Sequence, residues 1–222
     1  MPLADPRQTA GYLLGLRGRG IRSVAVLRAL EQTPRAAFAP PEHAHLAQAD
    51  MALPLACGQT MPEPLYTARL LEALDLAPHH RVLEIGTGSG FAAALMAALA
   101  AEVVTFERFR TLASQAAQRF RALKLDNIRA SWDDGLAAQL EAGRYDRIVA
   151  HGVIGDVPEV LSAALAPGGA MFAGRAAPGG RGAAQERQHL TRLTRGAPGS
   201  FAAKAVCGCR LLPLDEARAK AL

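Results

Sequence analysis

The segment that decides the fold is Arg81-Val82-Leu83-Glu84-Ile85-Gly86-Thr87-Gly88-Ser89-Gly90. A short apolar run that includes an acid leads into three alternating glycines, and the helix-forming residues 92–101 follow. This order predicts a strand, a tight turn and the start of a helix, an arrangement that places backbone N–H groups beside a bound cofactor. The spacing is not the Gly-x-Gly-x-x-Gly of dinucleotide sites, and the Gly-Lys-Ser/Thr ending of a P-loop is absent.

Strands and helices alternate after this turn. Short apolar runs predict strands, which lie at 82–85, 103–106, 127–130, 145–150 and 170–173. Apolar residues at helical spacing predict helices, which lie at 66–76, 91–99, 112–123 and 157–165, the last closed by Pro167-Gly168-Gly169. A glycine-rich loop at 176–184 and two later strands, 188–194 and 203–212, complete the pattern. We therefore expect an α/β, Rossmann-like fold with a mostly parallel, doubly wound sheet, covered on both faces, and antiparallel C-terminal strands.

The N-terminal part of the chain has a different character. Residues 7–33 show helical spacing that is broken at Gly18 and Gly20, and residues 34–64 are rich in Pro, Ala and Gln without a long period. A long irregular stretch in a compact protein usually has a function or covers one. We expect residues 1–64 to form a helical and loop cap on a cofactor-binding domain, residues 65–222, in one compact unit.

Composition limits the class of protein. Half of the 222 residues are hydrophobic and 20% are charged, which fits a folded domain and excludes disorder. No uninterrupted apolar run approaches about 18 residues, so we expect no membrane span. The first residues, Met1 to Arg7, lack the basic start and apolar stretch of a signal peptide, which predicts a cytoplasmic protein.

Cysteines and charges argue against several kinds of site. Cys57 stands alone and Cys207 and Cys209 flank one glycine, a pattern of neither a disulfide framework nor a zinc site, and we expect no metal. The net charge is +5, and nearly all the basic residues are arginines spread along the chain. Their densest stretch, residues 175–195, holds no aromatic side chain that would stack on bases, so we expect no nucleic-acid partner.

Polar side chains follow the predicted strands, at ends that meet along one edge of a parallel sheet. Glu107 stands 23 residues after Glu84, a distance at which a carboxylate can accept hydrogen bonds from the ribose hydroxyls of an adenosine ligand. Asp134, before Gly135, is either part of an ordinary turn or an acceptor for the exocyclic amine of adenine. His151 follows the fourth strand and either has a structural role or faces the reaction centre.

These features predict an adenosine site without a phosphate-binding lysine. S-adenosylmethionine fits such a site because its methionine part is small and zwitterionic. Methyl transfer from a sulfonium needs little acid–base chemistry, since placing the nucleophile in line with a good leaving group supplies much of the rate. The lack of a recognisable catalytic triad or metal cluster is consistent with this chemistry.

Residues 82–91 are Val-Leu-Glu-Ile-Gly-Thr-Gly-Ser-Gly-Phe and resemble the first motif of class I S-adenosylmethionine-dependent methyltransferases. Residue by residue, the resemblance is closest to the protein-L-isoaspartate O-methyltransferases. Residues 33–40, Thr-Pro-Arg-Ala-Ala-Phe-Ala-Pro, are similar to that family's Val-Pro-Arg-x-x-Phe-Val-Pro. Residues 53–60, Leu-Pro-Leu-Ala-Cys-Gly-Gln-Thr, are similar to its Leu-Pro-Ile-Gly-x-Gly-Gln-Thr. With later matches at 157–169 and 211–214, the resemblance covers nearly the whole chain.

The resemblance implies an activity and a set of site residues. The family methylates the free carboxylate of isoaspartyl residues in damaged proteins, which starts their repair, and S-adenosylhomocysteine is the other product. We expect the donor to be bound at and around the glycine turn, by Glu84, Gly86, Thr87, Gly88, Ser89, Glu107, Asp134 and Gly135. The loop 53–62 is expected to lie over the donor and to shape the acceptor pocket, through Leu55, Gln59, Thr60 and Met61.

The chain departs from the family on the acceptor side. Thr60 is in place as a catalytic position, but Pro62 stands where the family has a serine, and a proline offers neither a hydroxyl nor an N–H. His151 replaces a small residue after the fourth strand, and Arg175 lies where the family has Pro-Val-Gly. We expect both of these side chains to face the acceptor, and an arginine there could pair with an anion.

Three hypotheses follow from the sequence. The first is a methyltransferase that acts on isoaspartyl proteins or peptides. The second is a paralogue with another acceptor, which the departures at Pro62, His151 and Arg175 motivate. The third is a donor-binding module without transfer activity. The sequence leaves open whether the protein is a monomer or a homodimer, and whether residues 1–32 cap the site or form a dimer contact.

Overall fold

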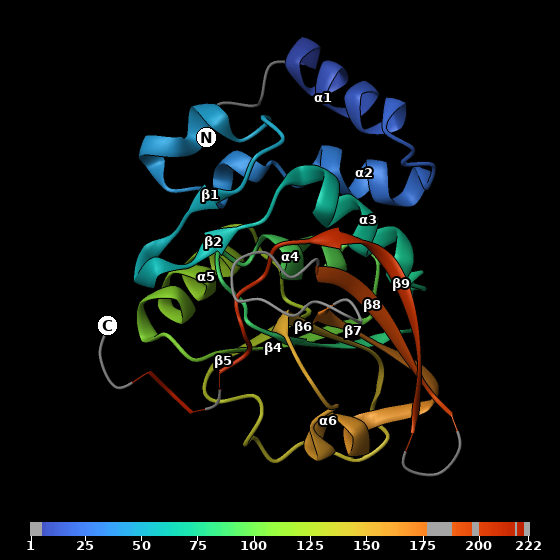
Figure 1. Cartoon of the computed structure of the whole chain (residues 1–222). Helices are drawn as coiled ribbons and strands as arrows, with labels where there is room; N and C mark the ends of the chain where they lie inside the picture. Colours follow the sequence, from blue (N-terminus) through green and yellow to red (C-terminus); the bar gives the residue numbers. More distant parts are fainter. Residues whose placement is uncertain (1–5, 177–187, 197–199, 216, 220–222) are drawn as a thin grey trace.

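The computed structural model describes residues 6–176, 188–196, 200–215 and 217–219 (Figure 1). The part of the predicted glycine-rich loop that follows residue 176 lies outside these ranges. The described chain forms a central sheet with helices packed against it, preceded by a helical N-terminal region. None of the described helices is long and apolar enough to cross a membrane.

Seven strands form the central sheet, in the order β5-β4-β3-β6-β7-β8-β9. The strands are β3 (Arg81–Ile85), β4 (Glu102–Glu107), β5 (Ile128–Trp132), β6 (Tyr145–Val153), β7 (Leu165–Ala176), β8 (Gln188–Arg195) and β9 (Phe201–Cys209). The first five strands in this order are parallel to one another, β8 pairs antiparallel with β7, and β9 pairs antiparallel with β8. From β3 the chain moves outward through β4 and β5 and then returns to β6 on the other side of β3. This reversal creates the crevice at the carboxyl ends where open α/β sheets bind ligands.

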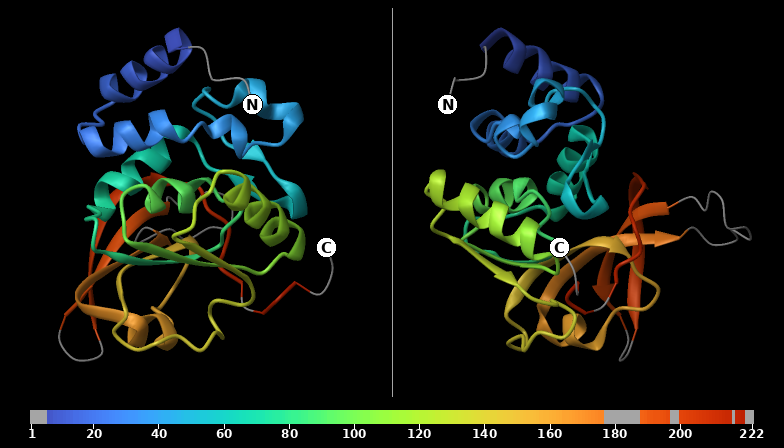
Figure 2. Two further views of the ribbon diagram at one scale, coloured as in Figure 1. Left: turned by 180° about the vertical axis from the view of Figure 1, so that it is seen from behind. Right: turned by 90° about the vertical axis from the view of Figure 1, so that its left-hand side faces the viewer.

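Helices cover the two faces of the sheet unequally. The five helices that lie on one side of the sheet are α1 (Pro6–Gly18), α2 (Val24–Gln32), α3 (Pro64–Leu74), α4 (Phe91–Ala97) and α5 (Arg110–Ala122). Figure 2 shows α1 and α2 stacked outside α3 and α4, away from the sheet. The opposite face packs against α6 (Glu159–Ala164) and against Leu136 and Leu140 of the segment before β6. The predicted doubly wound, mostly parallel sheet with antiparallel C-terminal strands is confirmed.

The region between α2 and α3 is made of short elements. They are the 3-10 helices η1 (Arg35–Ala37), η2 (Pro41–Leu46) and η3 (Ala56–Gly58) and the two-residue strands β1 (Leu53–Pro54) and β2 (Thr60–Met61), which pair with each other. This is the loop with short elements that the sequence predicted. Its Phe38 is fully buried, and its ring centroid lies 5.5 Å from that of Phe91 on α4, so the loop is packed onto the sheet domain.

Local sequence explains where the helices begin and end. The Ser23 side chain accepts a hydrogen bond from the N–H of Val26 at the start of α2, as an N-cap does. Pro64 begins α3 two residues before the predicted Tyr66, because a proline is well suited to the first helical position. Asp75 in a left-handed conformation ends α3 at Leu74.

Two predicted boundaries were wrong in ways that have a physical reason. The helix expected at 157–165 is limited to α6, because Leu165 pairs with Tyr145 of β6 and so begins β7. Pro167-Gly168-Gly169 therefore lies within β7 at a register shift, where Gly168 has a φ of 75°. The last strand ends at Cys209 rather than Leu212, because Leu212 leaves the sheet and accepts a hydrogen bond from the N–H of Val153.

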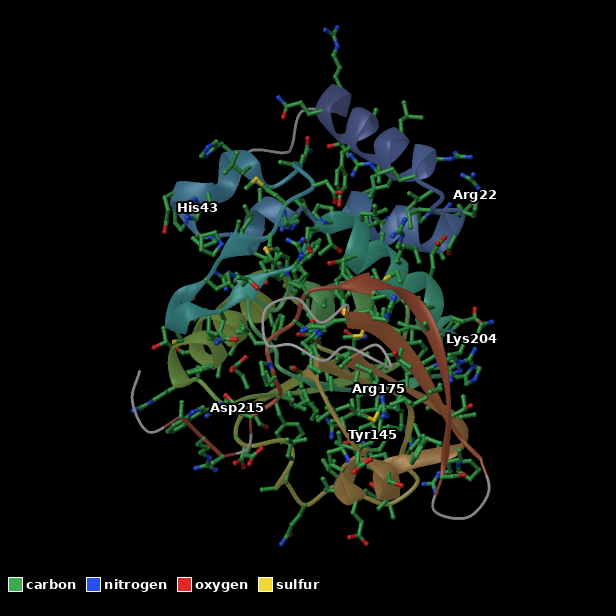
Figure 3. The ribbon with its side chains drawn as sticks, in the orientation of Figure 1. Arg22, His43, Tyr145, Arg175, Lys204 and Asp215 are labelled. Carbon is green, nitrogen blue, oxygen red and sulfur yellow. The ribbon has the colours of Figure 1, made fainter. Side chains whose placement is uncertain are left out.

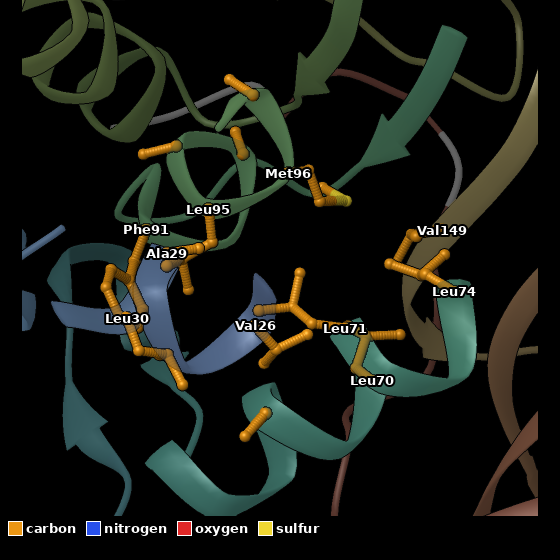
Figure 4. Close-up of a cluster of buried hydrophobic side chains, with 14 of the residues drawn as sticks. Val26, Ala29, Leu30, Leu70, Leu71, Leu74, Phe91, Leu95, Met96 and Val149 are labelled. Atoms are coloured by element: carbon orange, nitrogen blue, oxygen red, sulfur yellow. The ribbon is translucent and has the colours of Figure 1, made fainter. Parts of the chain in front are cut away.

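The larger core lies between the sheet and the helices of the N-terminal half. Figure 4 shows part of it, with side chains of α2, α3 and α4 gathered together and Val149 of β6 beside Leu74 of α3. Phe172 of β7 belongs to this core and has no exposed surface. Cys207 and Cys209 of β9 are half-buried against the same core.

We expect Phe172→Ala to lower the free energy of unfolding by about 3–5 kcal/mol, because it removes a fully buried aromatic ring and leaves a cavity. Leu14→Ala, at a side chain that is 67% exposed, is expected to change it by less than about 0.5 kcal/mol. Urea denaturation followed by circular dichroism measures both. Equal losses in the two variants would contradict the assignment of the core.

Candidate active site

The glycine turn after β3 is fastened to the neighbouring strand β4. The N–H groups of Gly86 and Thr87 donate to the carbonyl oxygen of Phe106, at 2.8 and 3.2 Å. The N–H of Gly88 donates to Oε2 of Glu107 at 2.8 Å. The turn is built on left-handed backbone, with φ of 94° at Gly86 and 54° at Gly88, which explains why glycine is required at these positions.

Fewer N–H groups of the turn are free than the sequence suggested. The N–H of Gly90 donates to the carbonyl oxygen of Thr87, and that of Phe91 to the hydroxyl of Ser89. Within the described chain, Ser89 is the residue from 86 to 91 whose N–H lacks a partner. The turn thus shapes the end of β3 mainly through its backbone path and offers a single N–H to a ligand.

Glu107 is a buried carboxylate that retains acceptor capacity. Its side chain takes one backbone N–H on each oxygen, from Gly88 at 2.8 Å and from Phe109 at 2.9 Å, and the residue is 4% exposed. A carboxylate has about four acceptor positions, so two remain for the hydroxyls of a ribose. Burial raises the pKa of Glu107, hydrogen bonds from the backbone N–H groups of Phe109, Gly88 and Arg108 lower it, and the nearby charge of Glu84 raises it.

Glu84 lies behind the turn, and the side chain of His151 lies between its carboxylate and the cleft. It has no exposed surface, and its Oε2 accepts a hydrogen bond of 2.6 Å from the hydroxyl of Thr105. Its Oε1 lies 2.9 Å from Nε2 of His151. The hydroxyl of Thr105 also lies 2.5 Å from that of Thr87, so the chain of hydrogen bonds returns to the turn. Glu84 therefore positions the residues around it in this structure, and its predicted contact with the donor stays a prediction.

A cleft of about 1500 Å³ opens beside the turn. Nine of the residues predicted for the site line it, namely Gln59, Thr60, Met61, Pro62, Gly86, Thr87, Gly88, Ser89 and His151. Leu55 packs against the turn instead, with its Cδ1 3.7 Å from where a Cβ on Gly88 would lie. Arg175 does not line the cleft, whereas His189, its register partner on β8, does.

The loop that forms one wall of the cleft is held by a buried arginine. Arg35 is 4% exposed, and its guanidinium donates to the carbonyl oxygens of Ala47, Met51, Met61 and Pro62, the last at 2.8 Å. The carbonyl groups of Met61 and Pro62 are therefore engaged with the cap. The side-chain amide of Gln59 donates one of its two N–H groups to the carbonyl oxygen of Cys57, and the hydroxyl of Thr60 is a further donor group on this wall.

Asp134 and Gly135 lie at the end of β5 with a neighbour that the sequence did not suggest. Oδ1 of Asp134 accepts from the N–H of Leu136 at 2.9 Å, and Oδ2 from the N–H of Ala217 at 2.6 Å. A Cβ on Gly135 would lie 2.5 Å from Cδ1 of Ile85, so only glycine fits against the end of β3. Each oxygen of Asp134 thus already accepts one backbone N–H, and its predicted contact with adenine stays a prediction.

That C-terminal segment crosses the carboxyl ends of the strands. Leu214 donates its N–H to the carbonyl oxygen of Val153 at the end of β6. Asp215 pairs with Arg108 after β4, and Arg218 with Asp133 after β5. Figure 3 shows Asp215 on the opposite side of the molecule from Lys204 of β9, which illustrates the length of this crossing. Residues 212–215 and 217–219 thus lie along the edge where the adenosine end of a donor is expected.

Sequence reasoning missed several residues that organise the site. Thr105 is the register partner of Glu84, and a threonine inside the apolar run of β4 was the available signal. Arg35 appeared only as part of a motif, and its role depends on a fold that brings residues 47–62 around it. No local pattern in residues 212–215 and 217–219 indicates that they contact the residues after β4 and β5.

Known proteins support a specific family. A model of the family described as protein-L-isoaspartate(D-aspartate) O-methyltransferase matches residues 10–219. The chain belongs to this family. The protein-L-isoaspartate O-methyltransferase of Azorhizobium caulinodans is 43% identical over 211 residues, which cover 95% of this chain and 94% of that protein. That of Rhodopseudomonas palustris is 41% identical over 213 residues, 96% of each chain.

A solved structure shares the fold of this chain. It is a Plasmodium falciparum protein described as a protein-L-isoaspartate O-methyltransferase, in complex with S-adenosyl-L-homocysteine. The TM-score is 0.75 with 19% identity, over 92% of this chain and 97% of that one. The predicted family is confirmed, and with it the class of S-adenosylmethionine-dependent methyltransferases.

We expect donor affinity to depend on the ionised form of Glu107. Because burial raises the pKa of this carboxyl, its protonation removes an acceptor for the ribose at a higher pH than in an exposed glutamate, whose pKa is about 4.3. Affinity should therefore be full above the pKa of Glu107 and fall as the pH drops through it. Calorimetric titration of S-adenosylhomocysteine across pH measures this.

Glu107→Gln is the matched variant for the pH experiment. We expect it to bind S-adenosylhomocysteine about 10- to 100-fold more weakly at neutral pH, because a charge-assisted acceptor is lost. Its affinity should not show the acidic decline of the wild type. The same decline in both proteins would assign it to another group.

Proposed function

We propose that this protein transfers the methyl group of S-adenosylmethionine to the free carboxylate of isoaspartyl residues in damaged proteins or peptides. The observation that supports this most is that the glycine turn after β3 and the loop that contains residues 59–62 line the same cleft. The chain also matches the isoaspartate methyltransferase family over residues 10–219. The donor supplies a positively charged sulfonium with a good leaving group. The protein supplies binding and alignment.

The donor side offers groups that fit an adenosine. Glu107 has acceptor capacity for the ribose hydroxyls, and the N–H of Ser89 is available at the turn. Gly86 and Gly88 leave the surface of the turn free of side chains, so a ligand can approach the backbone closely. Asp134, with Gly135 packed on Ile85, is the group proposed to receive the adenine amine.

The acceptor side needs a binding site for an anion and does not need a catalytic base. A carboxylate is already ionised at neutral pH, because its pKa is near 4. It attacks the methyl group directly, and holding it in line with the leaving sulfur supplies much of the rate. We propose that Gln59, Thr60 and Met61 position the acceptor from the loop, with the hydroxyl of Thr60 as a hydrogen-bond donor.

A second function remains for the same cleft, with the same donor and another acceptor. Pro62 stands where the family has a serine and contributes only a carbonyl oxygen, which is bound to Arg35. His151 projects into the cleft where the family has a small residue. Transfer to a different anionic small molecule or peptide would fit these two changes. Arg175, which lies outside the cleft lining, supports this alternative less than the sequence suggested.

The wider setting of the reaction is also part of the proposal. We propose a cytoplasmic protein that acts on damaged proteins without a nucleic-acid partner, as a monomer or a homodimer. Residues 1–64 would act as a cap whose loop closes one side of the site, and residues 65–222 as the methyltransferase domain. The four carbonyl bonds of Arg35 support a cap that positions the acceptor loop.

Incubation with labelled S-adenosylmethionine and a matched pair of peptides tests the function. We expect base-labile methyl ester on the peptide that contains isoaspartate and none above background on the same peptide with normal aspartate. Glu107→Gln should lower this incorporation at subsaturating donor. Equal labelling of the two peptides would contradict specificity for isoaspartate, and labelling of neither, with donor still bound, would favour the second function.

A further inference from the structure

The environment of Glu84 calls for a nearby positive charge. This carboxylate has no exposed surface, and its two hydrogen-bond partners are a hydroxyl, on Thr105, and the imidazole of His151. A second buried carboxylate, Glu107, is close enough for the charge of Glu84 to raise its pKa in addition to burial. Burying a carboxylate is costly unless a cation compensates it, and His151 is the basic side chain in contact with Glu84.

The hydrogen bond to Glu84 fixes how His151 presents itself to the cleft. Because the Glu84 carboxylate can only accept, Nε2 of His151 is the donor in this bond. The imidazole is 14% exposed and lines the cleft, and Nδ1 has no hydrogen-bond partner within the described ranges. A protonated His151 therefore directs one N–H at Glu84 and leaves the Nδ1–H for a ligand.

His151 also lies directly on the donor turn. A Cβ on Gly86 would be 3.3 Å from the Cβ of His151, so the two residues are in contact across the edge of the sheet. A ligand bound to Nδ1 would consequently lie beside the turn. On the loop wall, Pro62 has no donor, one of the two N–H groups of the Gln59 amide is engaged, and Thr60 presents a hydroxyl.

We infer that His151, protonated and held by Glu84, binds the acceptor carboxylate in this protein. The inference rests on the proposed function and names the residue that recognises its substrate. The arrangement alternates charges, with the Glu84 carboxylate, the imidazolium and the acceptor carboxylate in series. It supplies on the strand side of the cleft the hydrogen-bond donor that Pro62 does not supply on the loop side.

This role has a kinetic signature. The bond from the imidazolium is strongest to the anionic acceptor and weakens in the transition state, where the carboxylate has lost part of its charge on the way to the neutral ester. An interaction that favours the ground state lowers KM without raising kcat. Loss of His151 should therefore raise KM for the acceptor and leave kcat unchanged or slightly higher. A base would instead affect kcat, and a purely structural support of the turn would affect donor affinity.

The test compares wild type, His151→Gln and His151→Gln with Pro62→Ser, using an isoaspartyl peptide at saturating donor. We expect His151→Gln to raise KM about 10- to 100-fold, because it replaces a charged hydrogen bond, and to keep kcat within about 2-fold. Adding Pro62→Ser restores a neutral hydroxyl donor on the opposite wall and should recover about 3- to 10-fold in KM. His43→Gln, on η2 and outside the cleft lining, is the matched histidine control and should leave KM unchanged.

Calorimetric binding of S-adenosylhomocysteine to His151→Gln shows whether the variant is folded and its donor site intact, and we expect wild-type affinity within about 3-fold. An unchanged KM in an active His151→Gln enzyme would overturn the inference and leave the proposed function standing. A loss of kcat at constant KM, or a loss confined to donor binding, would also overturn it. A wild-type protein that binds donor but never methylates the isoaspartyl peptide would overturn both.

Discussion

The hydrogen bond from the Gly88 N–H to the buried Glu107 carboxylate is the contact on which the arrangement of the site depends. It joins the turn after β3 to the end of β4, next to the two N–H bonds that Phe106 accepts from the same turn. The position of the turn is thereby set by the neighbouring parallel strand as well as by its own glycines. A ligand that forms hydrogen bonds with Glu107 is consequently also held in a fixed position relative to the turn.

Much of this arrangement follows from the sequence, for identifiable reasons. Buried parallel strands have continuous apolar runs, so β3, β4 and β6 could be located within one to three residues. Glu107 could be placed at the end of β4, beside the glycine turn, because the end of the second strand has a defined place relative to that turn in such sheets. The start of β7 could not be located from the sequence. Leu165 is the last residue of an apolar helical period and lies in the sheet only because Tyr145 pairs with it.

Other features depend on contacts between distant parts of the chain. Arg35 is 27 residues from Pro62, and nothing near either residue indicates that a guanidinium holds that carbonyl group. Ala217 is 83 residues from Asp134, and its contact arises from the backbone N–H, which every non-proline residue has. The sequence could place Asp134 and His151 at strand ends, but the partners that decide their chemistry come from elsewhere in the fold.

Charge distribution relates the two sides of the cleft. Two buried carboxylates, Glu84 and Glu107, lie behind the turn on the donor side, and their negative charge suits a ligand with a positive sulfonium. The acceptor is an anion, and His151 is placed to separate it from Glu84. Transfer of the methyl group removes both the positive charge of the donor and the negative charge of the acceptor. The site therefore binds two oppositely charged reactants and releases two molecules that have each lost that charge.

A crystal structure with both S-adenosylhomocysteine and an isoaspartyl peptide tests this account most directly. The account predicts the ribose hydroxyls on the Glu107 carboxylate and the isoaspartyl carboxylate on Nδ1 of His151, with the Glu84 bond intact. It would be contradicted by a nucleoside bound away from the turn after β3. It would equally be contradicted by an acceptor carboxylate held by other residues while His151 faces away from it.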